Sequence, residues 1–447
     1  MAGGARSLAQ RDHDPDSRVP PGGEPAAAEL GVAGSEAAVA VEAAAQAAHA
    51  AAQDLQHATD RQLDEALLVM AGRLEDRSAD VLAENDADVQ AARADGLAAA
   101  FVDRLLLDGE RVRAMAGQLR ALAAIPAEPG ARPVRALPGG LELQEWRRPV
   151  GVIGANFEAR PNVALDVASQ LIKSRNAGVL RTGSGALRSA AVLVDVVIGP
   201  AMRDAGLNPA AVQLIRVPGR DAAYALVRQP RLIPLVILRG SGTSTRELAR
   251  EAALHGVRAL AHADGGAVMY IDQSADQDLA AQLIEASLDR LGVCNRLNLL
   301  LVQDAIWDTA LPRISQTAGR LGIALSLPPH AHELGHEWAL DTGHEATITV
   351  ARAADAADAA EIANSQTSGL AAAVVAEDPG TADLFLHAYA GTGAFWNAST
   401  RLLDGFRLLS MPETGINIDA VPGPRGPVTF QDLCLRQYVV LPAQAAG

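Results

Sequence analysis

Aromatic residues are scarce in this chain of 447 residues: Phe, Tyr and Trp together supply only 3% of it. A core with so few large rings must be packed mainly by Leu, Val, Ile and Ala. Apolar residues nevertheless reach 49% and charged residues only 20%, which excludes a wholly disordered protein. Because the chain is too long for one small core, we expect two large domains.

Cysteine is also scarce, since Cys294 and Cys434 are the only two. Two cysteines in so long a chain exclude a disulfide framework and are typical of a reducing compartment. The N-terminus lacks a basic start followed by an apolar core, and no apolar run reaches the roughly 18 to 20 residues that span a bilayer. We therefore expect a cytoplasmic protein that does not bind membranes.

Positive charge is in deficit, and the formal net charge is -15. Duplex affinity depends largely on Lys and Arg side chains that neutralise phosphates. This balance argues against a general nucleic-acid-binding protein and favours solubility. We expect a small-molecule substrate and no nucleic-acid partner.

The N-terminal quarter divides into a tail and a helical layer. Residues 1–34 are rich in Gly, Pro, Asp and Arg without a period, which predicts a disordered tail. Residues 35–53 are Ala-rich, and residues 59–104 continue with apolar residues at helical spacing. Residues 108–125 predict another helix, which ends before Pro126.

Alternating strands and helices follow, and they predict α/β architecture with doubly wound parallel sheets. In the first unit, residues 35–264, we expect strands at 150–154, 178–181, 212–215 and 235–238 and helices at 161–174, 187–205, 221–229 and 245–256. In the second unit, residues 265–410, we expect strands at 267–272, 297–302, 346–350, 371–375 and 394–396 and helices at 276–290, 354–364 and 381–390.

A separate arm is predicted from two alternating segments. Residues 141–147 read as a half-exposed strand, and residues 437–441, within the C-terminal segment 411–447, are suited to pair with it. A protruding two-stranded arm needs a partner chain to cover its apolar face. We therefore expect a homo-oligomer, either a dimer or a tetramer.

Two glycine-containing turns stand at strand ends: Arg181-Thr182-Gly183-Ser184-Gly185 and Leu238-Arg239-Gly240-Ser241-Gly242. Backbone N–H groups and a helix dipole at such a turn hold phosphate. Two such turns on one sheet favour a dinucleotide site, because ligands bind beyond the carboxyl ends of parallel strands. Neither matches G-x-G-x-x-G, so a standard Rossmann phosphate loop is not expected.

Cys294 lies between a helical run and an apolar run, in the segment Leu291-Gly292-Val293-Cys294-Asn295. A free cysteine in such a place is either a small apolar filler or a nucleophile. The residues around it leave both interpretations open.

The segment His332-Glu333-Leu334-Gly335-His336 matches the zinc motif H-E-x-x-H. The motif works only on a helix, and Pro328, Pro329 and Gly335 disfavour one here. We predict a solvated loop that binds no catalytic metal.

Several separated motifs, in the correct order, resemble the gamma-glutamyl phosphate reductase (glutamate-5-semialdehyde dehydrogenase) family of the aldehyde dehydrogenase superfamily, a family of proline biosynthesis. The resemblance runs from about residue 35 to residue 441. The matching stretches are Pro149-Val150-Gly151-Val152-Ile153-Gly154, Phe157-Glu158-Ala159-Arg160-Pro161-Asn162, Lys173-Ser174-Arg175-Asn176-Ala177-Gly178-Val179-Leu180-Arg181, Val293-Cys294-Asn295, Trp396-Asn397-Ala398-Ser399-Thr400-Arg401, Asp404-Gly405, Glu413-Thr414-Gly415-Ile416, Arg425-Gly426-Pro427 and Tyr438-Val439-Val440.

The resemblance implies a nucleotide-binding domain (35–264), a catalytic domain (265–410) and an oligomerisation arm. It also implies a reaction: the Cys294 thiolate attacks an acyl phosphate, phosphate leaves, NADPH reduces the thioester, and the hemithioacetal collapses to a semialdehyde. Backbone N–H groups near Cys294, with Asn295, would hold the oxyanion. The implied NADP-binding residues are Glu413 at the nicotinamide ribose and Arg181, Ser184, Gly240 and Ser241 at the adenosine phosphates.

The chain also departs from that family's pattern. Where the family typically has Gly-His-Ser-Asp, this chain has Gly369-Leu370-Ala371-Ala372; it has Gly265-Gly266-Ala267-Val268 in place of Gly-Asn-Cys-His, and Leu291-Gly292 in place of Pro-Ser. These losses remove polar groups from near the expected substrate pocket. Two alternatives follow: NAD(P)-dependent aldehyde oxidation, for which Asp264 is the carboxylate nearest the position of the usual glutamate base, and a non-catalytic paralogue.

Overall fold

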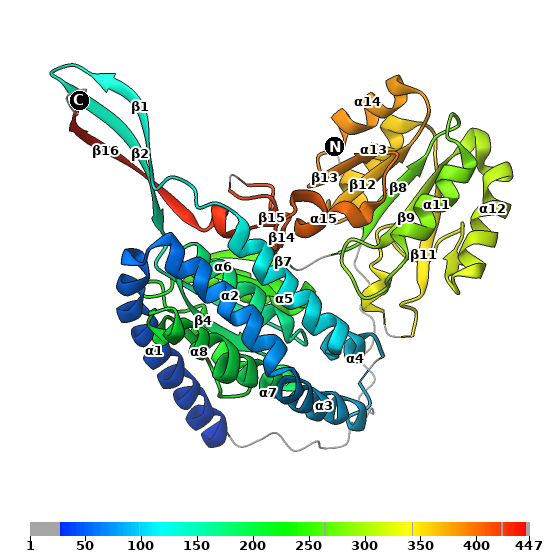
Figure 1. The fold of residues 1–447 in the computed structure, drawn as a ribbon. Helices are drawn as coiled ribbons and strands as arrows, with labels where there is room; N and C mark the ends of the chain where they lie inside the picture. The colour runs from blue at the N-terminus through cyan, green and yellow to red at the C-terminus, as the bar shows by residue number, and fades with distance from the viewer. Residues whose placement is uncertain are drawn as a thin grey trace, which may run out of the picture.

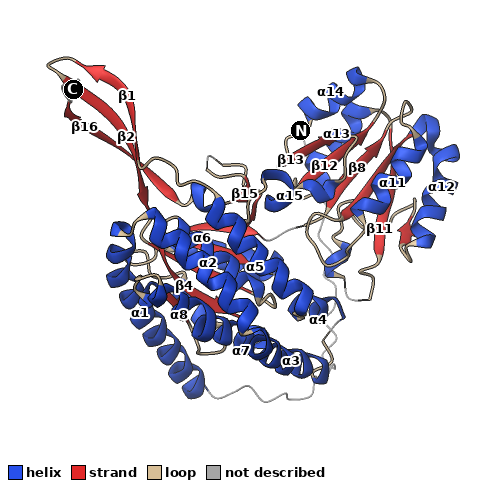
Figure 2. Cartoon of the chain, in the orientation of Figure 1, coloured by secondary structure: helices blue, strands red, loops and turns tan. Residues whose placement is uncertain are grey.

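The computed structural model describes residues 27–443 apart from residues 98, 241, 263, 264, 342 and 422. It contains two parallel sheets, each covered by helices, and an antiparallel arm that projects away from both (Figures 1 and 2). The α/β class and the doubly wound sheets predicted from the sequence are confirmed.

Five helices form the N-terminal layer: α1 (Ala27–His57), α2 (Asp60–Asp76), α3 (Ser78–Ala94), α4 (Ala99–Leu105) and α5 (Gly109–Ala124). The tail predicted for residues 1–34 overlaps α1, because the high helix propensity of Ala and Leu there outweighs two isolated glycines. Residues 1–26 lie outside the described residues. The single helical run expected over 59–104 is three helices, interrupted at Arg77 and at a turn where Gly96 has a φ of +70°.

The first sheet is parallel, in the order β5-β4-β3-β6-β7. Its strands are β3 (Val152–Phe157), β4 (Ala177–Thr182), β5 (Val212–Leu214), β6 (Leu235–Arg239) and β7 (Arg258–His262), and its helices include α6 (Asn162–Lys173), α9 (Asp221–Leu226) and α10 (Gly242–Leu254). We did not predict β7, whose Arg-Ala-Leu-Ala-His sequence has no β-branched residue. The strand order reverses between β3 and β6, which opens a crevice at their carboxyl ends.

One helical run of this domain, residues 184–204, is long and apolar enough to cross a membrane by length and composition alone. It consists of α7 (Leu187–Val192), a π-helical segment (Leu193–Ile198) and α8 (Gly199–Asp204). The expectation that no segment reaches that length is therefore wrong for this stretch. Its apolar composition is explained by packing, because Leu193, Ile198 and Met202 are fully buried in the domain core.

The second sheet is also parallel, in the order β10-β11-β9-β8-β12-β13. Its strands are β8 (Ala267–Ile271), β9 (Leu297–Gln303), β10 (Ala324–Ser326), β11 (Thr347–Ala353), β12 (Ala371–Val375) and β13 (Gly393–Trp396); its helices are α11 (Gln277–Ser287), α12 (Trp307–Arg320), α13 (Ala356–Gln366), α14 (Pro379–Ala388) and α15 (Gly405–Leu409). The sequence did not predict β10 or α12, because β10 is short and Pro312 lies inside α12.

The arm consists of β1 (Ala131–Leu137), β2 (Leu141–Pro149) and β16 (Cys434–Pro442), and its tip lies far from both sheets (Figure 1). The predicted pairing of β16 with β2 is present along the full length of both strands. The third strand, β1, was not expected; it carries Pro133 and an irregularity in its register with β2. Leu435, Tyr438 and Val440 are each at least half exposed on this arm. That a second copy of the chain covers them stays a prediction.

Candidate active site

A cleft of about 260 Å³ lies where the carboxyl edge of the first sheet meets the amino edge of the second. The first sheet contributes residues that follow β3 and β6, and the second contributes loops that precede β8, β9 and β12. The side chains that carry chemistry at this cleft are Arg104, Glu158, Arg160, Arg239, Cys294, Glu337 and Glu413. Each sheet therefore presents a different end of its strands to the same space.

Cys294 is exposed to this cleft from the loop before β9. Its loop lies tightly against glycines: a Cβ on Gly265 would come within 2.9 Å of the Cys294 Cα, and the Gly266 N–H donates to the Cys294 carbonyl oxygen at 2.8 Å. A filler cysteine would pack into a core instead. The placement favours the nucleophile interpretation, whereas Cys434 lies in the arm strand β16.

Opposing charges surround the Cys294 thiol. Desolvation by the surrounding protein raises its pKa, the Arg160 and Arg239 guanidiniums lower it, and the Glu413 and Glu337 carboxylates raise it. The thiol is therefore mostly protonated in the free protein at neutral pH. Its reactivity depends on the balance between the two arginines and the two glutamates.

Glu413 reaches the cleft from the segment before β14 (Gly415–Asn417), a strand that pairs with β15 (Gly426–Val428). Its Oε2 accepts a hydrogen bond from the Gly405 N–H at 2.7 Å, and burial raises its pKa to about 7. Its charge therefore changes within the physiological range, beside the thiol. The structure places Glu413 in the wall of this cleft. Its contact with a nicotinamide ribose stays a prediction.

Replacing Glu413 with Gln is expected to make Cys294 react severalfold faster with iodoacetamide at pH 8. Charged Glu413 raises the thiol pKa, so its removal lowers that pKa and enlarges the thiolate fraction at a given pH. The rates should converge below pH 7, where the native Glu413 is itself protonated. Alkylation rates in a Cys434→Ala background over pH 6 to 9 check this, and equal rates at every pH would contradict it.

Asn295 does not face the cleft, contrary to the role predicted for it. Its side chain is 3% exposed, and its Nδ2 donates to the Leu403 carbonyl oxygen at 2.9 Å. Its Oδ1 accepts from the Arg401 guanidinium, which also pairs with Asp289 at 2.6 Å. Both ends of the amide are thus engaged in holding the Cys294 loop, so the Asn295 side chain is not available to hold an oxyanion.

A second cavity of about 280 Å³ adjoins the first and shares Phe101, Glu158 and Ala159 with it. The predicted phosphate-binding residues Arg181 and Ser184 line this second cavity, whereas Gly240 lines the first. Ser241 lies outside the described residues. The two predicted turns therefore open on one continuous depression at the crevice of the first sheet.

The Arg181 side chain is held in place and partly unsatisfied. It donates to the Asn156 Oδ1 at 2.9 Å and to the Gly219 carbonyl oxygen at 2.6 Å, and burial lowers its pKa. Its Nε and the Thr182 Oγ1 are buried without a partner among the described residues. Buried polar atoms normally have hydrogen-bond partners, so this wall fits a bound polar group such as a dinucleotide.

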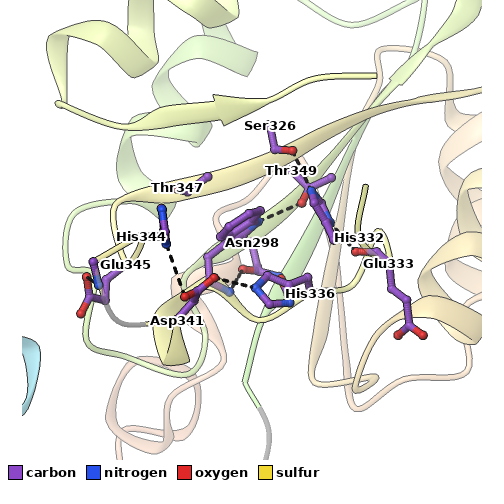
Figure 3. Close-up of polar contacts among 12 residues, drawn as sticks. Asn298, Ser326, His332, Glu333, His336, Asp341, His344, Glu345, Thr347 and Thr349 are labelled. Carbon is purple, nitrogen blue, oxygen red and sulfur yellow. Dashed lines mark hydrogen bonds and ion pairs between the residues drawn. The ribbon is translucent and has the colours of Figure 1, made fainter. Parts of the chain in front are cut away.

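The HELGH segment forms a loop, as predicted (Figure 3). The Asn298 Nδ2 on β9 donates to the His336 carbonyl oxygen at 2.7 Å. The His332 Nε2 lies 2.7 Å from the Ser326 Oγ, and the His336 Nε2 lies 3.1 Å from the Asp341 Oδ2. No group of three or more His, Cys, Asp or Glu residues is arranged to hold a metal in the described part of the chain. That this segment binds no catalytic metal stays a prediction.

This loop nevertheless contributes to the site through residues that the sequence analysis did not select. Glu337, directly after the HELGH segment, lines the cleft with Leu340. A Cβ on Gly266 would lie 2.4 Å from the Glu337 Oε2, so the carboxylate lies against the backbone beside Cys294. The sequence analysis also did not select Arg160 as a site residue. Its position shortly after a buried parallel strand could have indicated it, because ligands bind at the carboxyl ends of such strands.

Of the three residues that stand in place of the family's His, Ser and Asp, Leu370 alone lines the cleft. Ala371 and Ala372 are buried in β12, each within an apolar cluster. The expected loss of three polar groups from the substrate pocket is therefore a loss of one at the cleft wall and two in the core. Asp264, the candidate base for aldehyde oxidation, lies outside the described residues.

Comparison with known proteins confirms the resemblance seen in the motifs. The model of the aldehyde dehydrogenase family matches residues 24–331. The gamma-glutamyl phosphate reductase of Neisseria meningitidis is 33% identical over 398 residues, which cover 86% of this chain and 93% of that protein. The crystal structure of gamma-glutamyl phosphate reductase from Thermotoga maritima matches with a TM-score of 0.80 at 26% identity, over 90% of this chain and 98% of that one. An acetylating aldehyde dehydrogenase from Geobacillus thermoglucosidasius shares the fold, with a TM-score of 0.71 at 16% identity over 93% of this chain and 99% of that one.

Proposed function

Because the chain belongs to the aldehyde dehydrogenase family, we propose that it reduces an acyl phosphate to a semialdehyde with NADPH, through a thioester on Cys294. The observation that carries this proposal is the cleft itself. The Cys294 thiol, the guanidiniums of Arg104, Arg160 and Arg239, and the crevice of the first parallel sheet surround this one space. Relatives that resemble the chain over most of its length are named for the reduction of an acyl phosphate.

The chain's own residues divide the chemistry among them. The Cys294 thiolate forms the bond to the acyl carbon, and sulfur is suited to this because it is both a strong nucleophile and a good leaving group. Backbone N–H groups of the Cys294 loop stabilise the oxyanion, since the Asn295 amide is engaged elsewhere. Bound NADPH would supply the hydride that reduces the thioester. Glu413 lines the same cleft as Cys294.

The choice of NADP over NAD rests on charge in the second cavity. Proteins commonly bind the free ribose 2′-hydroxyl of NAD with a carboxylate and the 2′-phosphate of NADP with an arginine. This cavity contains Arg181 and Arg220 with the Ser184 and Ser244 hydroxyls. Its carboxylate, Glu158, accepts a hydrogen bond from the Ser244 Oγ at 3.1 Å. Cations therefore dominate the wall, which favours the phosphorylated cofactor.

Replacing Arg220 with Gln is expected to raise the KM for NADP by roughly three- to tenfold and to leave the KM for NAD unchanged. Arg220 is largely exposed and only weakly paired, with 3.4 Å to Glu247, so its contribution is smaller than that of a buried contact. Arg228→Gln is the matched control, because Arg228 pairs with Glu251 outside the cavity. Equal changes in both KM values would contradict an interaction with the 2′-phosphate.

The proposal is tested in the reverse direction with purified protein. An aldehyde panel, NADP and inorganic phosphate should give NADPH formation that depends on phosphate, because phosphate is needed to release the acyl group from Cys294. The panel includes glutamate semialdehyde and uncharged aldehydes of similar length. Turnover at the same rate without phosphate would overturn acyl phosphate chemistry.

Glu337 supports one alternative, NAD(P)-dependent oxidation of an aldehyde to an acid. That reaction needs a base to activate water on the thioester, and Glu337 brings a carboxylate to the backbone beside Cys294 from an unexpected loop. The same assay separates the two functions. Oxidation that ignores phosphate and is lost in Glu337→Gln would establish the alternative.

A further inference from the structure

Two arginines of the cleft, Arg160 and Arg239, lie at the carboxyl ends of the adjacent strands β3 and β6, at the crevice of the first sheet. Arg239 is the last residue of β6, where it pairs in register with Phe157 of β3, and Arg160 follows β3 closely. Both side chains line the cleft together with Cys294. Across the part of the chain that the structure describes, neither guanidinium donates a hydrogen bond or forms an ion pair.

The two arginines carry positive charge that no hydrogen bond or ion pair within the described residues neutralises. Burial and the neighbouring Arg239 charge lower the pKa of Arg160 to about 10, so it remains a cation at neutral pH. Two buried carboxylates carry charge near these arginines: Glu413, which lines the same cleft, and Asp166 on α6, whose pKa burial raises to about 6. Asp166 already accepts a hydrogen bond from the Asn162 Nδ2 at 2.8 Å. Charged groups in a cleft are normally paired, so two unpaired guanidiniums beside a thiol predict an anionic ligand.

We propose that Arg160 and Arg239 together bind the phosphoryl group of the acyl phosphate and the inorganic phosphate that it becomes. This inference rests on the proposed function. When the Cys294 sulfur bonds to the acyl carbon, the bond between that carbon and the phosphate oxygen breaks, and phosphate leaves with the electron pair. The two guanidiniums face the growing negative charge and stabilise it.

Geometry favours a phosphoryl group over a distant carboxylate of the substrate. The leaving phosphate is joined directly to the carbon that sulfur attacks, so its site must adjoin Cys294. Both arginines meet this requirement, because both line the same cleft as Cys294. Two planar forks of N–H donors also match a phosphate with two negative charges better than a single carboxylate.

The test measures the reverse reaction with aldehyde, NADP and inorganic phosphate in the variants Arg160→Gln and Arg239→Gln. Each substitution is expected to raise the KM for phosphate by roughly ten- to a hundredfold, because it removes a charged hydrogen-bonding contact. The KM for aldehyde should stay within about twofold of wild type. Arg290→Gln is the matched control, because it removes a nearby cation that pairs with Asp103 at 3.2 Å and does not line the cleft. A selective rise in the KM for aldehyde would overturn the proposal.

A second measurement needs no turnover. Millimolar phosphate should slow the alkylation of Cys294 by iodoacetamide in the Cys434→Ala protein, at ionic strength held constant with chloride. That protection should be lost in Arg160→Gln and Arg239→Gln and kept in Arg290→Gln. If the wild-type protein lacks phosphate-dependent turnover but shows this pattern, acyl phosphate reduction is wrong and the phosphate site stands. If phosphate gives no protection to the wild-type thiol, the phosphate site is wrong.

Discussion

Replacing Cys294 with Ala is expected to lower turnover by a factor on the order of 10⁴ or more, because it removes the only sulfur that lines the cleft. Binding of NADPH should persist, because the second cavity, where Arg181 and Ser184 lie, does not include Cys294. The substitution removes only one sulfur atom from a side chain exposed to the cleft, so the fold should be retained. Steady-state rates and NADPH titration by fluorescence check both expectations.

Cys434→Ala is the matched control for this experiment. Cys434 lies at the start of β16, where burial raises its pKa and its neighbours are arm residues rather than cleft residues. Its loss should leave turnover close to wild type. A dead Cys434→Ala protein with an active Cys294→Ala protein would reverse the assignment. If both variants and the wild type are inactive on every acyl phosphate and aldehyde tested, and NADPH does not bind, the chain is the non-catalytic paralogue.

The sheets and the thiol were predictable from local patterns. Strands such as β4 and β6 are short apolar runs bounded by glycine turns, and the alternation of strands with helices dictates parallel pairing. Cys294 was predictable as a candidate because only two cysteines exist and one of them follows a glycine turn. The ordered motifs that resemble the reductase family favour the nucleophile interpretation of Cys294, which stays a prediction.

The direction of side chains was not predictable. Asn295 follows Cys294 directly, yet its amide turns to Leu403 and Arg401, residues more than a hundred positions away along the chain. Glu337 belongs to a loop with no regular structure, and only the tertiary arrangement places it against Gly266. Contacts of this kind depend on how two loops that are distant in the sequence pack together. The periodicity of apolar residues does not predict them.

The HELGH segment and the residue that follows it have different surroundings. The HELGH histidines contact Ser326 at the end of β10 and Asp341 (Figure 3), whereas the next residue, Glu337, lines the cleft that contains Cys294. The apparent metal motif therefore acts as part of the wall that carries Glu337, Ala339 and Leu340 to the cleft.

Glutamate semialdehyde is expected to be a poor substrate in the reverse reaction, with kcat/KM roughly ten- to a hundredfold below that of an uncharged aldehyde of similar length. The reductases that this chain resembles typically carry His where Leu370 lines the cleft here. A polar substrate group left unpaired against Leu370 costs about 1 to 3 kcal/mol, which corresponds to that range of rates. The ratio is measured by determining kcat/KM for glutamate semialdehyde and for the uncharged aldehyde, each at saturating NADP and phosphate.

Leu370→His should shift that ratio toward glutamate semialdehyde, because it returns an imidazole to the wall of the cleft. Ala371→Ser is the matched control: Ala371 is buried in β12 away from the cleft, so a hydroxyl there should leave the ratio unchanged. An efficiency for glutamate semialdehyde of roughly 10⁴ M⁻¹s⁻¹ or more in the wild-type protein would refute the expected preference. In that event Glu337 is the carboxylate in place to pair with the substrate ammonium group, and Glu337→Gln should then weaken glutamate semialdehyde selectively.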